Sequence, residues 1–537
     1  MDEIRQPPMI QPMKFMRSCS GLLRLSLIVA AVNAAAQNYS IAPGPFKPTW
    51  DSLEQNYTIP DWYRDAKFGI WAHWGPQCQP QQGDWYAQRM YVQGHAQNKF
   101  HVEHYGPPSQ FGFKDVIHEW KADQWKPEEL FKRYQRAGAK FFVAMANHHD
   151  NFDMYDSQFQ PWNSINVGPK RDIVGTWAKL AHAAGMPFGV SVHSARAWSW
   201  YEVAQGADTN GPLAGISYDG KLTKADGKGK WWDGLDPQDL YAQNHQPGVP
   251  PDAAYVTKWF NRTKDLLDKY HPDLLYFDDA KLPLGDAGLN IAAHYFNANK
   301  QWHDGKLEGV ITSKNLSDDE QKAVINDLER NLTEDLLQTP WQKDLCIGAW
   351  HYDDNRYESG YRSARSMVNL LVDVVSKNGT FLLNIPLRGD GSIDDKEIAF
   401  LDDFTKWMDV NSECIYGTRP WTIYGEGPSV KHDATAQATV KNAPRGIGPE
   451  HNAADIRFTT KAGALYVIAL GWPADGSLVI KSLAANSPLY KDEIGKIELL
   501  GSFEKINFTR NDTGLTVNLP GHRDGNHATA LKISPKK

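Results

Sequence analysis

The chain has 537 residues, too many for one compact core, and this length suits two or three domains. Hydrophobic residues make up 41% of the chain and charged residues 23%, which is the balance of an ordinary globular protein. A formal net charge of -7 and an isoelectric point near 6.2 argue against a nucleic-acid partner, which would require a basic face.

The N-terminal segment has the features of a secretory signal peptide. Three basic residues precede or enter an apolar run from Leu25 to Val32, namely Lys14, Arg17 and Arg24. Ala34–Ala36 then offers an A-x-A cleavage site before Gln37, and the apolar run is too short to span a membrane. We therefore predict that residues 1–36 are removed, that the mature protein is secreted or periplasmic, and that it has no stable membrane anchor.

The cysteines do not form a disulfide framework. Cys19 would leave with the signal peptide, and three cysteines would remain, namely Cys78, Cys346 and Cys414. An odd number excludes full pairing, and their spacing matches no zinc site. We expect mostly buried thiols and at most one disulfide.

Short apolar strands alternate with amphipathic helices from about residue 60 to 420. The expected strands are Lys67–His73, Lys140–Ala146, Pro187–His193, Leu274–Asp278, Gly309–Ser313, Leu345–Trp350 and Thr380–Pro386. Three clear helices are Trp125–Ala137, Asp172–Ala184 and Tyr255–Tyr270. This alternation implies parallel strands and predicts a (β/α)8-type barrel, which we assign to residues 37–420. A doubly wound sheet is the alternative, but no Gly-rich phosphate-binding motif follows any strand.

The pattern changes after Trp421. Four short strands separated by Gly, Pro and Asn turns are expected at Ala454–Phe458, Leu465–Leu470, Ser477–Ile480 and Lys496–Leu500. We predict a C-terminal β-sandwich over residues 421–537, with a role in packing and stability. A carbohydrate-binding module is the alternative, because Trp472 lies near a strand end.

Polar residues follow most of the expected barrel strands. These strand ends are Ala72–Gly75, Asn147–Asp150, His193–Ser194, Asp278–Asp279, Lys314–Asn315 and Trp350–Tyr352. Barrel enzymes place their reactive residues at the carboxyl ends of the strands. Six ends that converge with His, Asp, Trp and Lys side chains predict a site for a polyhydroxylated ligand.

Asp278 is the main candidate for chemistry. It closes the apolar strand Leu274–Phe277 and should point into the barrel mouth, where a carboxylate can attack an anomeric carbon. The alternative is that Asp278 caps a following helix. Strand alternation should turn Asp279 the other way, into a structural role.

The histidines allow two interpretations. His148 and His149 are adjacent, and the chain has no H-x-H or H-E-x-x-H spacing. Metal binding is therefore disfavoured. A neutral imidazole suits hydrogen bonding to sugar hydroxyls, since it donates with one nitrogen and accepts with the other.

Several long motifs resemble the α-L-fucosidases of glycoside hydrolase family 29. They are Ala66–Gly75, Gly83–Tyr86, Asn147–Asp150, Gly168–Asp172, Pro272–Asp278, Asn378–Pro386 and Ile415–Trp421. The resemblance runs from about residue 58 to 425, with the motifs in the same order, and continues more weakly to the end.

The resemblance implies a retaining exo-glycosidase that removes terminal α-L-fucosyl residues from glycans through a covalent fucosyl-enzyme, without metal or organic cofactor. Asp278 matches the nucleophile. Four residues match positions that hold fucose, namely His73, His148, His149 and Trp85. The segment Asp327–Arg330 is similar to one branch's acid/base loop and points to Glu329, with Glu334 second and Asp327 third.

Four further residues complete the expected sugar site, namely Asp84, His193, Lys314 and Trp350. Asp84 stands where many members of the family carry Glu, His193 where others carry Tyr, and Lys314 where some use Arg. These departures leave the leaving-group preference open. Two alternatives also remain, which are a related exo-glycosidase for a sugar such as α-L-galactose and a non-catalytic fucose-binding protein on the same fold.

Overall fold

The computed structural model describes residues 39–242, 244–329, 331–430, 450–521 and 527–536. The expected signal peptide, residues 1–36, lies outside this range. Within these residues, no helix combines the length and the apolar character that crossing a membrane requires.

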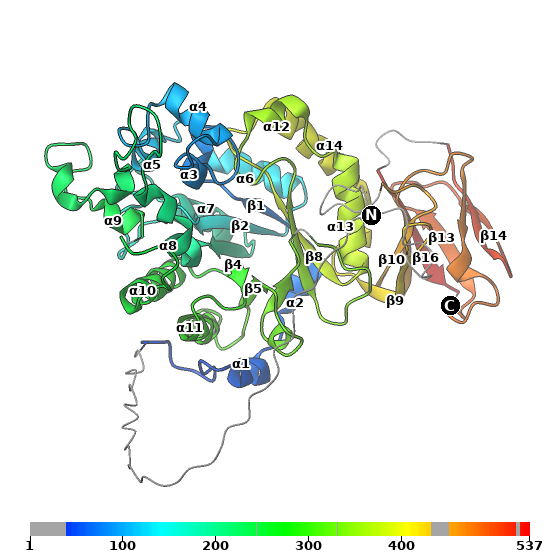
Figure 1. The fold of residues 1–537 in the computed structure, drawn as a ribbon. Coiled ribbons are helices and arrows are strands. Elements are labelled where there is room, and N and C mark those ends of the chain that lie inside the picture. Colours follow the sequence, from blue (N-terminus) through cyan, green and yellow to red (C-terminus); the bar gives the residue numbers. More distant parts are fainter. Residues whose placement is uncertain (1–38, 243, 330, 431–449, 522–526, 537) are drawn as a thin grey trace, which may run out of the picture. The chain divides into compact units, whose positions relative to one another are not determined.

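Eight parallel strands close into a barrel in chain order (Figure 1). They are β1 (Phe68–Ala72), β2 (Phe141–Asn147), β3 (Phe188–Val192), β4 (Leu274–Ala280), β5 (Val310–Lys314), β6 (Ile325–Asp327), β7 (Trp341–Cys346) and β8 (Gly379–Asn384). The barrel closes where β8 pairs with β1, with Phe381 opposite Phe68. The predicted fold class is confirmed.

Helices cover the barrel from outside, as Figure 1 shows for α10 and α11 beside β4 and β5. The α-helices are α1 (Trp50–Asn56), α2 (Asp61–Ala66), α3 (Tyr86–Arg89), α4 (Ala96–His104), α5 (Phe113–Glu119), α6 (Pro127–Arg136), α7 (Ile173–Ala183), α8 (Ala197–Trp200), α9 (Pro237–Leu240), α10 (Ala253–Tyr270), α11 (Asp286–Trp302), α12 (Asp354–Ser359), α13 (Ala364–Ser376) and α14 (Asp395–Asn411). The three helices expected from the sequence correspond to α6, α7 and α10, with ends shifted by one or two residues.

The strands form because both of their faces are buried. Every residue of β2 is buried, which requires the continuous apolar run that the sequence carries there. Inward side chains from successive strands fill the interior, and they include Trp71, Phe141, Val143, Tyr276, Val310, Ile325 and Leu382. On the outer face of β4, Phe277 packs against Trp259 of α10, with ring centroids 5.9 Å apart. Alternation along β4 therefore sends Tyr276 and Asp278 inward.

Two strand predictions need correction. No strand was expected at β6, because three residues are too short to show a periodicity. The strand expected at Leu345–Trp350 is wrong, since β7 spans Trp341–Cys346. Two of its buried positions, Gln342 and Asp344, are polar, so the apolar run in the sequence starts only at Leu345.

The C-terminal region consists of two antiparallel sheets. One sheet has the order β13-β16-β11-β10-β9 and the other β12-β15-β14. Their bounds are β9 (Arg419–Glu426), β10 (Ile456–Lys461), β11 (Ala464–Ala469), β12 (Ser477–Ile480), β13 (Ile494–Leu499), β14 (Asn507–Asn511), β15 (Gly514–Asn518) and β16 (Thr529–Pro535). One apolar core, with members such as Phe458, Val467, Leu478, Leu515 and Ile533, joins both sheets. The predicted sandwich architecture is confirmed, although β9, β14, β15 and β16 were not expected.

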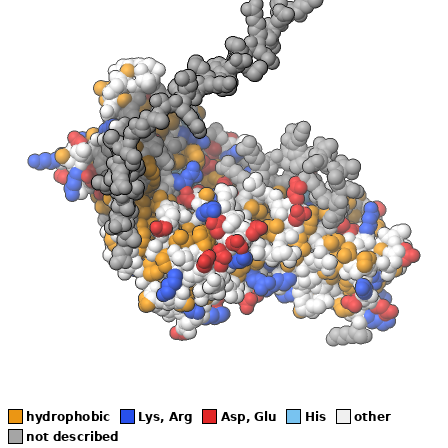
Figure 2. All heavy atoms as spheres, turned by 60° about the horizontal axis from the view of Figure 1, so that its bottom comes forward, with side chains coloured by type: hydrophobic (Ala, Val, Ile, Leu, Met, Phe, Trp, Pro, Cys, Tyr) orange, Lys and Arg blue, Asp and Glu red, His pale blue; other side chains and the backbone are white. Residues whose placement is uncertain are grey.

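The sandwich contacts the barrel through α13, which packs against β9 and β10. At this contact the Arg457 Nε donates to Asp373 Oδ1 at 2.6 Å, and both side chains are buried. Acidic and basic side chains are interspersed over the face of the molecule shown in Figure 2. Cys78, Cys346 and Cys414 are buried free thiols, as expected.

Candidate active site

A pocket of about 540 Å³ opens at the carboxyl ends of the barrel strands. It is lined by all ten candidates from the sequence, namely His73, Asp84, Trp85, His148, His149, His193, Asp278, Lys314, Glu329 and Trp350. The second and third acid/base candidates, Glu334 and Asp327, are not among its lining residues. Segments far apart in the chain thus meet in one cavity, as barrel closure requires.

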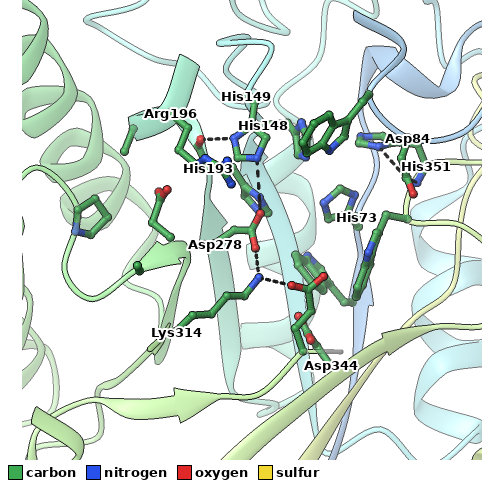
Figure 3. Close-up of a pocket in the computed structure, with 18 of the residues that line it drawn as sticks. His73, Asp84, His148, His149, His193, Arg196, Asp278, Lys314, Asp344 and His351 are labelled. Atoms are coloured by element: carbon green, nitrogen blue, oxygen red, sulfur yellow. Dashed lines mark hydrogen bonds and ion pairs between the residues drawn. The ribbon is translucent and has the colours of Figure 1, made fainter. Parts of the chain in front are cut away.

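Asp278 and Glu329 share one cation, the Lys314 ammonium, which Figure 3 shows next to Asp278. The Lys314 ammonium forms an ion pair with Asp278 Oδ1 and donates to Glu329 Oε2 at 2.8 Å. Because one oxygen of each carboxyl group contacts the same nitrogen, the two groups stand side by side, as the closely spaced carboxyl pair of a retaining glycosidase does.

The surroundings keep Asp278 ionised. Burial would raise the pKa of Asp278, but the Lys314 ammonium and the His193 imidazole outweigh it and hold the pKa well below its usual range. His193 Nδ1 lies 3.0 Å from Asp278 Oδ2, and Ser191 Oγ donates to His193 Nε2 at 3.0 Å. His193 therefore gives its one hydrogen to the carboxylate and orients it. An ionised carboxylate in this position is a competent nucleophile.

His148 and His149 present opposite hydrogen-bonding groups to the pocket. The Gln77 amide donates to His148 Nδ1 at 2.8 Å, so His148 Nε2 carries the hydrogen. His149 Nδ1 donates to the His193 carbonyl at 2.7 Å, which leaves its Nε2 as an acceptor. Burial lowers the pKa of His148 well below its usual value and that of His149 to about 3, so both rings are neutral at pH 7.

A metal ion is the alternative use of these rings. One nitrogen from each of His73, His148 and His193 lies within 4.8 Å of the others, a spacing that three imidazoles could use to hold an ion. However, His193 bonds at both nitrogens and His148 keeps its hydrogen on Nε2, whereas a metal needs free lone pairs. The hydrogen-bond pattern fits hydroxyl groups better, and the absence of a metal stays a prediction.

Aromatic rings and Asp84 form the remaining walls. Trp71 and Trp350 lie 5.4 Å apart between ring centroids, and Trp85 lies across the pocket beside His149 at 6.5 Å. Asp84 Oδ1 accepts from the backbone N–H of His351 at 2.8 Å, which ties the loop after β1 to the loop after β7. Such rings can pack against the C–H faces of a sugar while the imidazoles bind its hydroxyls.

The sequence argument missed several members of the site. Trp71, Asp344 and His351 line the pocket, and Tyr276 lies directly beneath Asp278. Alternation along β4 could have pointed to Tyr276, which lies two residues before Asp278. Asp344 was missed because the expected strand began only at Leu345, whereas β7 begins at Trp341.

Asp279 was expected to turn away from the site, but it lines the same pocket. The pairing of β4 with β5 is irregular between Tyr276 and Ala280, which breaks the simple alternation. Burial, together with the charge of Asp278, raises the pKa of Asp279 to about 7. The backbone carbonyl of Asp279 accepts from Ser313 Oγ at 3.0 Å.

Comparison with known proteins identifies the family of the chain. The family model "Alpha-L-fucosidase" matches residues 33–413, and "Alpha-L-fucosidase C-terminal domain" matches residues 450–534. The chain belongs to the α-L-fucosidase family. It is therefore a glycoside hydrolase.

Relatives with this activity match nearly the whole chain. Tissue alpha-L-fucosidase of Rattus norvegicus is 25% identical over 511 residues, covering 91% of each chain. Plasma alpha-L-fucosidase of Homo sapiens is 24% identical and covers 88% of each. The fold is that of Thermotoga maritima alpha-fucosidase solved with a mechanism-based inhibitor, which has a TM-score of 0.67 at 23% identity and covers 91% of this chain and 99% of that one.

Proposed function

We propose that Asp278 is the nucleophile and Glu329 the acid/base of a retaining α-L-fucosidase. The observation that carries this assignment is the Lys314 ammonium, which contacts one oxygen of each carboxyl group. Asp278 lies at the barrel end of β4 with two histidines on its other oxygen, His193 at 3.0 Å and His149 at 3.7 Å. Glu329 lies on the loop after β6.

The reaction then takes two steps. Asp278 Oδ attacks the anomeric carbon while Glu329 gives its proton to the glycosidic oxygen, so that the aglycone leaves and a fucosyl ester forms. Glu329, now a carboxylate, takes a proton from water, and the resulting oxygen nucleophile releases L-fucose and regenerates Asp278. Negative charge moves from Asp278 to Glu329 in the first step and returns in the second. Lys314 contacts both groups, so its ammonium can stabilise the negative charge on either of them.

We assign the sugar-binding roles by chemistry. His148 Nε2 donates to a hydroxyl and His149 Nε2 accepts from one, so the pair recognises two neighbouring hydroxyl groups. His73 and Asp84 contribute further polar contacts. Trp85 and Trp350 take the C–H face and the methyl group of the sugar.

The substrate and location follow the same assignment. A fucosylated oligosaccharide or glycoconjugate is the proposed substrate, and secretion or periplasmic export through residues 1–36 would bring the enzyme to it. We propose a catalytic barrel over residues 37–420 and a sandwich over residues 421–537 that stabilises the barrel.

Hydrolysis of an aryl α-L-fucoside by the purified mature protein tests this proposal. Asp278→Ala should lose at least about a thousandfold in kcat, because the covalent step disappears. Glu329→Ala should be slow as well but regain rate with added azide, which needs no base to attack the fucosyl ester.

The exposed Asp318→Ala serves as the matched control and should keep full activity. Activity retained by Asp278→Ala would overturn the nucleophile assignment, and azide rescue of Glu334→Ala in place of Glu329→Ala would move the acid/base. Release from an aryl α-L-galactoside but not from the fucoside would favour the related exo-glycosidase. If the wild type hydrolyses neither glycoside, the chain is either a sugar-binding protein or an enzyme that demands a specific natural aglycone.

A further inference from the structure

Beneath the two catalytic carboxyl groups lies a buried cluster to which the reaction assigns no role. It consists of Tyr276 from β4, Asp327 from β6 and Asp344 from β7. The Tyr276 hydroxyl lies 3.0 Å from Asp327 Oδ2, 2.9 Å from Asp344 Oδ2 and 3.5 Å from Asp278 Oδ1. All three side chains of the cluster are buried, with Asp327 3% and Asp344 1% exposed.

The short contacts of this cluster cannot all be hydrogen bonds if both aspartates are ionised. A phenol carries one hydrogen and can donate to only one oxygen, while an ionised carboxylate can only accept. With both aspartates ionised, one contact of about 3 Å would join two oxygens without a hydrogen between them. Such a contact is repulsive and costly in a buried site. One of the two carboxyl groups must therefore carry a proton and donate it to the phenol oxygen.

We infer that Asp327 and Asp344 hold a single proton between them, and that Asp344 carries it and donates it to Tyr276, which in turn donates to Asp327. This inference rests on the proposed roles of Asp278 and Glu329 only for its effect on catalysis. The chain of donors itself depends on the geometry alone.

Two observations place the proton on Asp344. Asp344 Oδ1 is buried and has no hydrogen-bond partner among the described residues, which is costly for a carboxylate oxygen and cheaper for the carbonyl of a neutral acid. Asp327 Oδ1 has the Gln342 amide as a weak donor at 3.5 Å. Burial, with the charge of Asp327 next, raises the pKa of Asp344 well above its usual value, whereas that of Asp327 rises only to about 6.

The charges around the pair act in both directions. The charge of Glu329, when that group is ionised, favours protonation of the pair, while the ammonium groups of Lys314 and Lys343 oppose it. Lys314 lies over the Tyr276 ring, with its nitrogen 5.8 Å from the ring centroid, and pairs with the two catalytic carboxyl groups. Burial, with a smaller effect of the Arg362 charge, lowers the pKa of Lys343 itself.

The shared proton makes Tyr276 and Asp344 positioning residues. With Asp344 neutral, the floor of the site carries one negative charge instead of two, so that Lys314 stays with Asp278 and Glu329. With Tyr276 donating to Asp327, its hydrogen is not available to Asp278 Oδ1, and the nucleophile keeps its lone pairs for the sugar. Loss of the Asp344 proton would add a second negative charge beneath the site and would free the Tyr276 hydrogen to turn toward Asp278.

Infrared spectroscopy of the carboxyl groups tests the inference directly, because a protonated aspartate shows a C=O stretch that a carboxylate lacks. Asp344→Asn should remove one such band from the wild-type spectrum at pH 8, whereas the exposed Asp319→Asn should remove none. A band that is kept in both Asp344→Asn and Asp327→Asn overturns the inference, whereas a band lost in Asp327→Asn but kept in Asp344→Asn overturns only the placement of the proton.

The wild type provides a second measurement that needs no substitution at residue 344. With carbon-13 at the aspartate carboxyl, an isotope-shifted C=O band should persist at pH 8, above the pKa of about 7 of Asp279. Its absence would overturn the proposal even if Asp344→Asn failed to fold.

Kinetics separate a positioning role from a merely structural one. Asp344→Asn keeps a neutral donor toward Tyr276 and should stay near wild-type kcat/KM at pH 7, while Asp344→Ala should lose about tenfold or more. Equal losses in the two variants would contradict the donor role. The infrared result does not depend on turnover, so an inactive wild type would refute the proposed function and leave the shared proton testable.

Discussion

At the scale of single residues, function depends on which charges meet in the pocket. Asp278 is a stronger acid than an ordinary aspartic acid, and His73, His148 and His149 are weaker bases than ordinary histidines. Burial disfavours every charged form, so the imidazoles become neutral, while Asp278 stays ionised because Lys314 and His193 oppose that effect. Neutral imidazoles thus lie beside one ionised carboxylate.

Replacing Lys314 tests whether its charge keeps Asp278 ionised against the effect of burial. Lys314→Met should reduce kcat/KM about 10²–10³-fold, because a charge-stabilising donor is lost from both catalytic groups. It should also raise the pKa of Asp278, because Lys314 is the largest influence that lowers it. As the proposed nucleophile, Asp278 must be ionised, so the acidic limb of the pH profile of kcat/KM should move to higher pH.

The exposed Lys281, which pairs with Glu320 outside the pocket, provides the matched control. Lys281→Met should leave the profile unchanged. An acidic limb at the wild-type pH in Lys314→Met would show that Lys314 does not control the ionisation of Asp278.

At the scale of elements, the barrel strands are held by tight packing across their neighbours. Gly69 of β1 is paired with Phe141 of β2, and a Cβ at Gly69 would lie 2.4 Å from the nearest atom of the Phe141 ring. Phe141 is 1% exposed and packs against Tyr63 and Trp62 of α2 at the base of the barrel, so its ring has little room to move.

We therefore expect Gly69→Ala to lower the free energy of unfolding by about 1–3 kcal/mol, the usual effect of overpacking a core. Denaturant unfolding followed by tryptophan fluorescence measures it. Gly521→Ala is the control, because no heavy atom lies within 4 Å of the added Cβ. If Gly69→Ala is as stable as the control, the Phe141 ring can move to make room for the added methyl group.

At the scale of the whole molecule, the sandwich is attached to the barrel through a buried ion pair. Arg457 of β10 and Lys377 after α13 both contact Asp373. Burial would raise the pKa of Asp373, but these two cations hold it well below its usual range. A carboxyl group with a lowered pKa stabilises the folded state above the unfolded pKa of about 3.9, and this contribution is lost as the pH falls below it.

Arg457→Met should therefore lower the free energy of unfolding by about 3–5 kcal/mol at pH 7, since it leaves a buried carboxylate with one partner fewer. The difference from the wild type should shrink below about pH 4, where the carboxyl group protonates in the unfolded chain. Thermal and denaturant unfolding at pH 7 and pH 3.5 measures both effects. Arg136→Met breaks an exposed pair with Asp409 and should change stability by at most about 1 kcal/mol. A difference that does not depend on pH would rule out the ion pair as its cause.

The sequence by itself determined the fold class and most of the pocket. The apolar runs alternate with helical periodicity and predict parallel pairing, and the polar strand ends of a closed barrel necessarily face one another. Alternation along Leu274–Phe277 was enough to turn Asp278 inward, and family motifs added Asp84, Trp85 and Glu329 from loops where no periodicity exists.

The tertiary structure alone decided the register and the buried charges. Whether Asp344 enters the barrel depends on where β7 pairs with β6 and β8, and this pairing joins residues that are distant in the chain. The turn of Asp279 into the pocket arises from an irregular pairing of β4 with β5. The cluster of Tyr276, Asp327 and Asp344 exists only because closure brings three strands together in a buried site. There the position of a single hydrogen depends on neighbours that no local sequence pattern encodes.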